Sequence, residues 1–467
     1  MESIKTMPVD GGVPIKFFLT PELAPEPETI SQLARLAQIP GLQHHVAVLP
    51  DIHRKSRNLS PTGAVVVTKN ALAPRAIDTG ICCGIRMIRT DIDVRDLIPH
   101  SGTLDEIFSE LMATIPVLEH EQDVISKNEV AEILVSGGQW SQKKFGLSDD
   151  EMNCMENRAT MPTDTDDAEA ILASVPEKIL KKARRCFGTL GDGNHFLELQ
   201  EIVEVINHDI ARLLGLDAGR AMFMLHTGSR SVGSKTMKTY LEILERRFFP
   251  SLSSFDEPPL WSMPANSEEG IGFSRAIAAA SNFGFANRIA ITGKLREAVC
   301  KVLRDETLQL PLLYDCAHVS IKPELWNGGA EKLWVHRHGA SRALPPSKMA
   351  DHPIFSQTGQ PVPIPGSMGH DSYVGVADER TVETFYSVNH GAGRVMDKPE
   401  ALTQFTDAAV EQEMCEKNIR LYRYGADHIA EQAPSAFKDI SQVIRAMSAL
   451  SLARPVVRLR PVAVLKG

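Results

Sequence analysis

Four histidines stand out because each ends an apolar run or sits among glycines. His195 follows a glycine-rich turn in "GTLGDGNHFLELQ", and His390 precedes two glycines in "FYSVNHGAGRVM". His226 and His318 end the apolar runs "RAMFMLH" and "LPLLYDCAH", and Cys83 in "AIDTGICCGIRMI" adds a thiol. Imidazole nitrogens and thiolates are common ligands of transition metals. Because these residues are scattered along the chain, they indicate a catalytic metal site more than a zinc finger.

Glycine-rich stretches accompany these residues. The segments "GTLGDGNH", "IPGSMGHDSY" and "NHGAGR" could each present backbone N–H groups to phosphate oxygens. None has the Walker A pattern or the Rossmann fingerprint, and one glycine loop alone is weak evidence. Together with the metal-type residues, they favour a phosphate-handling metalloenzyme. From these residues alone, His390 remains open as a metal ligand, a proton carrier or a nucleophile.

The apolar patterns predict the elements that must position these residues. No repeat, low-complexity tract or linker interrupts the chain, which indicates an α+β protein built as one large unit over residues 1–467. Pro461 in the last predicted strand favours an edge or a bulge. The polar, acidic segment 137–176 is expected to be a surface insertion. The periodicities predict helices over 28–38, 281–304 and 400–432, a loop over 261–270, and strands over 44–53, 63–70, 84–92, 220–227, 310–317 and 455–465.

Composition restricts the class of protein. With 43% hydrophobic and 23% charged residues among 467, the chain is globular. Its net charge of −9 argues against gross attraction to nucleic acid, although a local basic groove remains open. No apolar run suits a membrane span, and the N-terminus has no signal-peptide pattern. Seven scattered cysteines do not indicate a disulfide framework. We expect a cytoplasmic monomer that does not associate with membranes.

Over nearly its whole length the chain resembles the RtcB family of GTP-dependent RNA ligases. The resemblance rests on "LPDIH", "CCGIRMIRT", "GTLGDGNHFLE", "HTGSRSVG", "SEEG" with "ANR", "YDCAH", "VHRHGASRALPP", "IPGSMG", "NHGAGRVM" and "RLRPVAVLKG". It implies a mixed-sheet α+β fold. It also implies an enzyme that joins RNA 2′,3′-cyclic phosphate or 3′-phosphate ends to 5′-hydroxyl ends with GTP and Mn²⁺, in RNA repair or tRNA splicing.

The resemblance also implies roles for individual residues. His390 would attack the α-phosphorus of GTP and form a histidine–GMP intermediate, which activates the RNA 3′-end. Cys83, His195, His226 and His318 would hold metal. Arg230 and Arg337 are expected at RNA phosphates on weaker grounds. The positions implied for GTP are Asn194, His195, Phe196, Leu197, Glu198, His318, Pro365, Gly366, Ser367, Met368, Ser372, His390, Gly391, Ala392, Gly393, Phe437 and Lys466.

Several positions depart from the family pattern. Gly80 stands where the family has an aspartate ligand, with Asp78 or Cys82 as substitutes. Since the remaining ligands are softer, Zn²⁺ or Co²⁺ is an alternative to Mn²⁺, and one metal ion an alternative to two. Val319 replaces an asparagine. Phe437 stands where a tyrosine is frequent, so ring stacking is kept without the hydroxyl. The loop after "LPDIH" is longer than in the family and carries three cationic residues: Arg54, Lys55 and Arg57.

These departures leave other functions open. One is an enzyme that guanylylates itself and caps RNA 3′-phosphates, or opens cyclic phosphates, without sealing. Another is a non-catalytic RNA-binding scaffold with a structural metal. Such a scaffold would keep its RNA affinity and biological role in the His390→Ala variant. An activating partner such as archease also remains open.

Overall fold

The computed structural model describes residues 4–55, 59–97, 101–249, 259–425 and 428–467, with two large sheets at the centre. The first sheet runs β1 (Lys5–Met7), β2 (Ile15–Phe17), β3 (Leu42–His53), β4 (Thr62–Thr68), β12 (Glu331–His338) and β11 (Val319–Trp326). The second runs β10 (Leu312–Ala317), β6 (Gly84–Asp93), β8 (Arg220–Thr227), β7 (Phe196–Val205), β18 (Ala453–Lys466), β15 (Ser372–Ala377) and β14 (Pro361–Ile364), with β17 (Arg420–Arg423) beside β18. Two short ladders join β13 (Ala340–Arg342) to β16 (Ser387–Asn389) and β5 (Ala71–Leu72) to β9 (Met263–Pro264).

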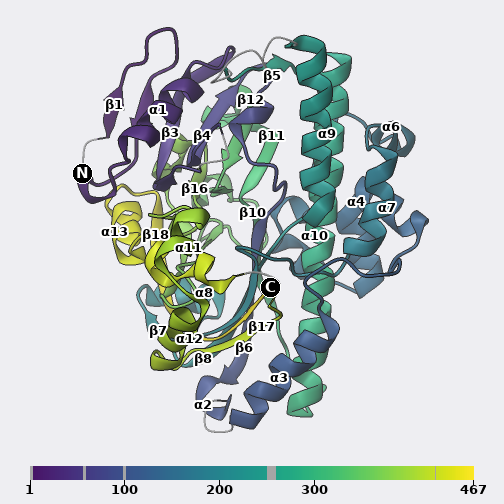
Figure 1. Cartoon of the computed structure of the whole chain (residues 1–467), viewed down its shortest axis with the longest axis vertical. Helices are drawn as coiled ribbons and strands as arrows, with labels where there is room; N and C mark the ends of the chain where they lie inside the picture. Colours follow the sequence, from purple (N-terminus) through teal and green to yellow (C-terminus); the bar gives the residue numbers. More distant parts are fainter. Residues whose placement is uncertain (1–3, 56–58, 98–100, 250–258, 426–427) are drawn as a thin grey trace.

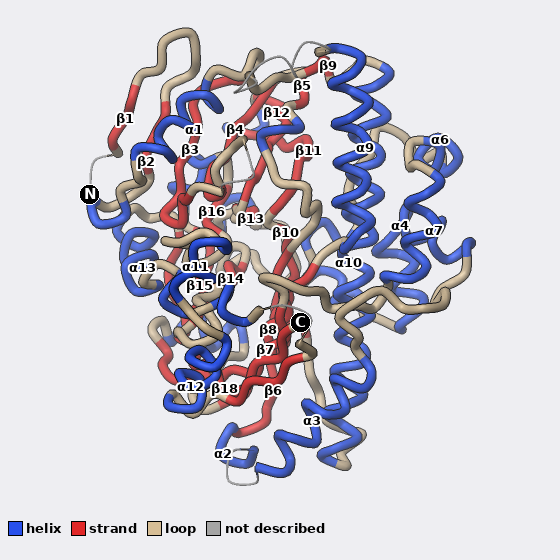
Figure 2. Tube along the Cα trace, viewed as in Figure 1, coloured by secondary structure: helices blue, strands red, loops and turns tan. Residues whose placement is uncertain are grey.

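Helices cover the sheets, and four of them gather along one flank: α4 (Lys127–Phe145), α7 (Glu177–Cys186), α9 (Arg230–Phe248) and α10 (Glu268–Leu303) (Figures 1 and 2). Ser267 caps α10 by accepting a hydrogen bond from Gly270 N. Most of α10 is buried, as expected of a helix that is apolar on every side. The remaining helices are α1 (Pro27–Ala37), α2 (Val94–Leu97), α3 (Ser101–Thr114), α5 (Asp149–Asn153), α6 (Ala168–Ala173), α8 (His208–Leu214), α11 (Lys398–Gln404), α12 (Asp407–Glu416) and α13 (Ile440–Ala449).

The α+β class predicted from the sequence is confirmed. The second sheet is mixed, because β17 runs parallel to β18 while the other pairs are antiparallel. The helix predicted over 28–38 is α1, and the strands predicted over 44–53, 63–70 and 84–92 are β3, β4 and β6. No described helix combines the length and apolar character that a membrane span requires.

Other predictions need correction. The long helix begins at Glu268 rather than near 281, because Ser267 supplies its cap. The helical prediction for 400–432 is wrong after α12, where β17 pairs with β18. Pro461 lies at a register shift, as a bulge requires, but β18 is an inner strand and not an edge.

The segment 137–176 is folded onto the body of the protein. It contains part of α4 and all of α5 and α6, and α4 and α6 both contact α10. Trp140, Met155 and Ile171 are buried in the main hydrophobic core. Most of the acidic residues that made this segment look loosely structured are exposed, but Glu156 is buried and pairs with Lys322, and sparse apolar residues anchor the segment. That it is an insertion relative to the family remains a prediction.

Candidate active site

The strand register of the second sheet brings the metal-type residues to one end. Gly84 pairs with Thr227 on β8 and with Ala317 on β10, which sets the preceding Cys83 opposite His318 and diagonally across from His226, the partner of Ile85. Phe196 pairs with His226, so His195 enters the same group. Backbones approach closely here: a Cβ on Gly228 would lie 2.7 Å from Cys83 Cα. Residues that are distant in sequence therefore meet because of pairing register and not because of local spacing.

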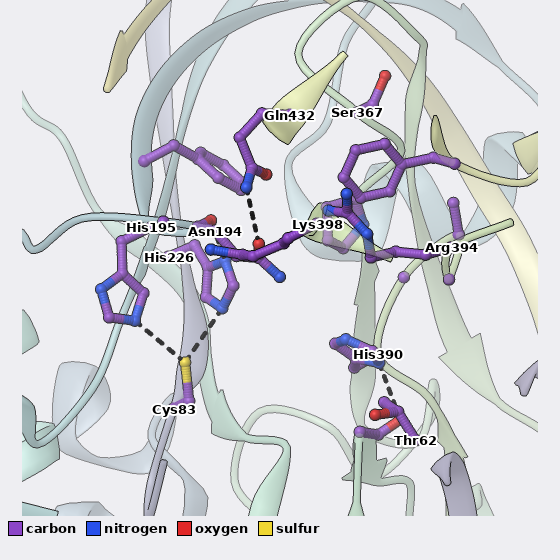
Figure 3. Close-up of a pocket in the computed structure, with 18 of the residues that line it drawn as sticks. Thr62, Cys83, Asn194, His195, His226, Ser367, His390, Arg394, Lys398 and Gln432 are labelled. Carbon is purple, nitrogen blue, oxygen red and sulfur yellow. Dashed lines mark hydrogen bonds between the residues drawn. The ribbon is translucent and has the colours of Figure 1, made fainter. Parts of the chain in front are cut away.

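Three of these side chains form a compact group of donor atoms. The ligand atoms of Cys83, His226 and His318 lie within 4.8 Å of one another. His226 Nε2 is 3.2 Å from Cys83 Sγ and 3.3 Å from His318 Nε2. Ligands at about 2.0–2.3 Å around a tetrahedral metal are roughly 3.3–3.7 Å apart, so the group has the size of a metal site. Figure 3 shows the rings of His195 and His226 turned toward the Cys83 sulfur.

Burial keeps these groups neutral in the absence of a metal. It raises the pKa of Cys83 to about 12 and lowers the pKa of His226 to about 3. It also holds the pKa values of His195 and His318 well below their usual range. The imidazoles are thus available as neutral ligands, and a bound cation would supply the charge that stabilises a Cys83 thiolate.

Hydrogen bonds set which ring nitrogen faces the group. His226 Nδ1 lies 2.9 Å from the Asn194 carbonyl oxygen, an acceptor, so Nδ1 carries the hydrogen and Nε2 offers its lone pair. His195 is arranged differently. Arg230 donates to His195 Nδ1 at 2.9 Å, and His195 Nε2 lies 3.4 Å from Cys83 Sγ. A metal ion at Nε2 of His195 would require the ring hydrogen to move to Nδ1 and Arg230 to turn away.

Two residues of α10 support these loops. Arg288 is fully buried, donates to the carbonyl oxygens of Cys82 and Thr227, and pairs with Asp315 at 2.8 Å. Asn287 donates to the carbonyl oxygens of Thr189 and Gly228. The sequence motif "ANR" contains both residues, but nothing local in it reveals that they tie three ligand-bearing loops together.

His390 follows β16 and is held by two acceptors. Its Nδ1 lies 2.6 Å from Asp51 Oδ2 and 2.9 Å from the Gly339 carbonyl oxygen. Since both partners accept, Nδ1 carries the hydrogen and Nε2 of the neutral ring is free to act as a nucleophile. The ring centroids of His390 and His318 are 4.7 Å apart, so the metal-type group lies beside it.

These residues line one cavity of about 870 Å³. Most of the predicted nucleotide positions face it, but Leu197 points into the core on the opposite face of β7. The cavity also contains residues that sequence reasoning had not placed at the site. The predicted site residues that line it are Asp78, Cys83, Asn194, His195, Phe196, Glu198, His226, His318, Pro365, Gly366, Ser367, Met368, Ser372, His390, Gly391, Ala392, Gly393, Phe437 and Lys466, and the additional ones include His53, Lys55, Thr62, His338, Gly339, Arg394, Lys398 and Gln432.

One end of the cavity is rich in hydrogen-bonding groups. Burial raises the pKa of Glu198 to about 8, against the opposing effects of Gln200 and Lys466. Gln200 Nε2 donates to Glu198 Oε1 at 2.5 Å and to Ser372 Oγ at 3.1 Å. Lys466 Nζ donates to the Gly193 carbonyl oxygen at 2.8 Å. A buried carboxyl beside a lysine is suited to a polar heterocycle that has both donors and acceptors.

An aromatic surface and two paired polar residues also border the cavity. The Arg394 guanidinium lies 4.7 Å from the centroid of the Phe437 ring. Gln432 Nε2 donates to Asn194 Oδ1 at 3.0 Å, an interaction visible in Figure 3. Phe437 therefore presents its ring to the cavity, with the Arg394 cation packed on it, although it lacks the hydroxyl of a tyrosine.

The departures from the family pattern have structural consequences. Asp78 lines the cavity but lies outside the compact donor group, and its Oδ2 pairs with Lys55 Nζ. Burial opposes ionisation of Asp78, yet Lys55 and nearby donors hold its pKa below the usual range. Cys82 is fully buried, with Arg288 within reach of its sulfur at 3.8 Å, so it does not substitute as a ligand. Arg57 lies outside the described residues.

The two arginines expected at RNA phosphates are both engaged within the protein. Arg230 donates to His195 and to the Val117 carbonyl oxygen, which makes it a support of the metal-type group. Arg337 is fully buried and forms a two-bond pair with Glu324, at 2.7 Å for both contacts. The expectation for Arg337 is therefore corrected, because its guanidinium is not available to an external phosphate.

Comparisons with known proteins cover almost the whole chain. A family model described as tRNA-splicing ligase RtcB matches residues 32–467. A protein of that name from Pyrobaculum aerophilum is 33% identical over 449 residues, which are 94% of this chain and 91% of the relative. Another from Archaeoglobus fulgidus is 33% identical over 472 residues, or 97% and 95% of the two chains. The relative from Nanoarchaeum equitans is 31% identical over 470 residues, with the same coverage.

Proposed function

Because the chain belongs to the RtcB family of tRNA-splicing ligases, we propose that it is an RNA ligase that works through a guanylylated His390. The substrates are an RNA end with a 2′,3′-cyclic phosphate or 3′-phosphate and an RNA end with a 5′-hydroxyl. The reaction serves RNA repair or tRNA splicing.

One observation carries the proposal: His390 Nδ1 donates to Asp51 and Gly339, inside a cavity that also holds a metal-type group. The neutral ring then presents Nε2 as an attacking atom. When Nε2 bonds to the α-phosphorus of GTP and pyrophosphate leaves, the ring becomes cationic. The carboxylate of Asp51 stabilises that charge without moving, which lowers the barrier.

Cys83, His226 and His318 would hold a metal ion, with His195 joining after a change of tautomer. A metal ion here would neutralise charge on the phosphate oxygens. Family resemblance favours Mn²⁺, whereas the thiolate and imidazole donors favour Zn²⁺ or Co²⁺. Glu198, Lys466 and Phe437 would then bind the guanine base, with Glu198 losing its proton on binding so that its carboxylate accepts from the N–H groups of the base.

We also propose a cellular compartment, an oligomeric state and a partner for the enzyme. All seven cysteines are free thiols, which agrees with a reducing compartment such as the cytoplasm. We expect a monomer, with an archease-like protein as an activating partner.

A single RNA assay separates ligation from its alternatives. The protein is incubated with GTP, metal and an RNA that carries a 5′-hydroxyl and a labelled 3′-phosphate, and ligated and guanylate-capped products are resolved on one gel. We expect joined RNA, with capped RNA only as a transient species. Capped RNA that accumulates without joining would support a capping enzyme. The absence of both joined and capped RNA would contradict the proposal.

A further inference from the structure

A lysine that the sequence analysis left without a role enters the wall of the proposed active site. Lys55 follows β3, and it lines the same cavity as Cys83, His318 and His390. Its Nζ contacts Asp78 Oδ2, while Asp78 Oδ1 accepts from the Thr79 backbone N–H at 2.6 Å. Both carboxylate oxygens of Asp78 are thus engaged, and the ammonium is fixed at the cavity wall.

The turn that holds the ammonium packs against the metal-type group. Cys83 N donates to the Gly80 carbonyl oxygen at 3.0 Å, and Asp78, the partner of Lys55, lies in the same turn two residues earlier. Lys55 and Cys83 therefore line the same side of the cavity. The Lys55 side chain is 43% exposed, so it remains accessible to a ligand in the cavity.

Among the described residues, no carboxylate belongs to the donor group around Cys83. In the described part of the chain, the compact donor group of Cys83, His226 and His318 is the one such group of three or more. Asp78 is outside it, and Gly80 has no side chain. An ammonium beside a metal ion also repels a second divalent cation.

The reaction nevertheless requires positive charge beyond one metal ion. GTP brings a triphosphate, and charge develops on the leaving pyrophosphate. Arg394 and Lys398 also line the cavity and both contact Glu431: Arg394 its carbonyl oxygen at 2.6 Å and Lys398 its carboxylate at 3.0 Å. Lys55 differs from them in position, because its partner Asp78 belongs to the turn that is hydrogen-bonded to Cys83.

We propose that the Lys55 ammonium, held by Asp78, is the second cation of this site and takes the place of a second metal ion at the GTP phosphates. The chain then carries one metal ion per site. This inference rests on the proposed function, since it presumes that GTP binds in the cavity. It makes Lys55 a residue that contacts substrate, and Asp78 the residue that positions it.

The test compares wild type, Lys55→Met, Gly80→Asp with Lys55→Met, and Lys144→Met as a control. Lys144 is a half-exposed helix lysine paired with Glu129 and is not part of the cavity. Each protein is loaded with Mn²⁺ or Co²⁺, desalted and analysed for metal content. GTP affinity is then measured by calorimetry at saturating metal. The aspartate has room at position 80, because an added Cβ would meet only Cys83 Cβ, at 3.9 Å.

We expect one metal ion per chain in the wild type and in Lys55→Met, with GTP binding weaker in Lys55→Met by roughly tenfold or more. The double variant should hold two metal ions and recover much of the GTP affinity, whereas Lys144→Met should match the wild type. Two metal ions in the wild type, or unchanged GTP affinity in Lys55→Met, would overturn the inference while leaving the proposed function intact. Wild-type protein that holds metal but binds no GTP would overturn both.

Discussion

His390 Nδ1 and Asp51 Oδ2 are 2.6 Å apart, although 339 positions separate the two residues in the chain. Asp51 is fully buried on β3, whereas His390 follows β16 and is partly exposed to the cavity. Among the described residues, the second oxygen of Asp51, Oδ1, has no hydrogen-bond partner. The hydrogen bonding of the carboxylate is therefore directed at the histidine.

Asp51→Asn should lower the rate of histidine guanylylation by roughly 10²–10⁴-fold. The amide can still accept from Nδ1, but it supplies no charge to stabilise the cationic ring. Metal content and thermal stability should stay close to wild type. The measurement is the initial rate of label transfer from α-labelled GTP, with the exposed Asp209→Asn as a control. Equal rates in Asp51→Asn and wild type would contradict the role of Asp51.

Gly393 lets the chain after His390 pass close to the backbone of Asp51. It has φ +76°, and an added Cβ would lie 2.2 Å from the Asp51 carbonyl oxygen. Gly11 offers a matched comparison, because it has φ +70° with no atom within 4 Å. Gly11→Ala should cost about 1 kcal/mol of unfolding free energy from backbone strain alone, and Gly393→Ala more than about 2 kcal/mol.

Denaturant titration of both variants gives these free energies, and guanylylation assays show the effect on the site. Gly393→Ala should also reduce guanylylation, whereas Gly11→Ala should not. Equal destabilisation of the two variants would mean that the close approach to Asp51 is unimportant.

Cys83 and Cys82 are adjacent thiols with different environments. Cys83 lies among the imidazoles, and Cys82 points toward Arg288. Cys83→Ser should weaken metal binding by at least about tenfold, since a hydroxyl is a poorer ligand than a thiolate for a soft metal. Cys82→Ser should leave metal affinity near wild type. Titration with Co²⁺, followed by its thiolate absorption band, measures both. The band should disappear in Cys83→Ser and persist in Cys82→Ser; the reverse pattern would refute the assigned ligand.

Glu198 should make stability depend on pH. Burial raises its pKa from 4.5 to about 8, so the folded protein favours the protonated form. The resulting stability is fully present below about pH 4.5 and is lost as the pH rises toward 8. Glu198→Gln removes this dependence. The loss of unfolding free energy between pH 5 and 8.5 should be smaller in the variant, by on the order of a few kcal/mol. Parallel pH profiles of the two proteins would show that Glu198 is not buried as a neutral acid.

The sequence was informative where patterns are local. Alternating and periodic apolar residues located β3, β4, β6 and α1, and the histidines at the ends of apolar runs met at one end of a sheet. It was less informative where a partner distant in the chain decides the structure. β17 forms a strand because it pairs in parallel with β18, which is distant in the sequence. The few apolar residues of 137–176 form a buried face only because α4 and α6 pack on α10.

The supporting residues of the site illustrate the same limit. Asp51, Lys55 and Arg288 are separated from their partners by long stretches of chain, and no spacing in the sequence connects them. Arg337 shows the opposite error, because the family resemblance suggested a phosphate contact for it. Its role is decided by Glu324 on the neighbouring strand.

The most direct measurement is transfer of label from α-labelled GTP to the protein. Wild type and His390→Ala are incubated with labelled GTP and Mn²⁺, Zn²⁺ or Co²⁺ and then separated by denaturing electrophoresis. We predict that the wild type alone carries label, and that the label is lost in acid and kept in base, as a histidine phosphoramidate requires. Label of equal intensity on His390→Ala, or no label on wild type with any of the metals, would contradict the proposal that His390 is the nucleophile.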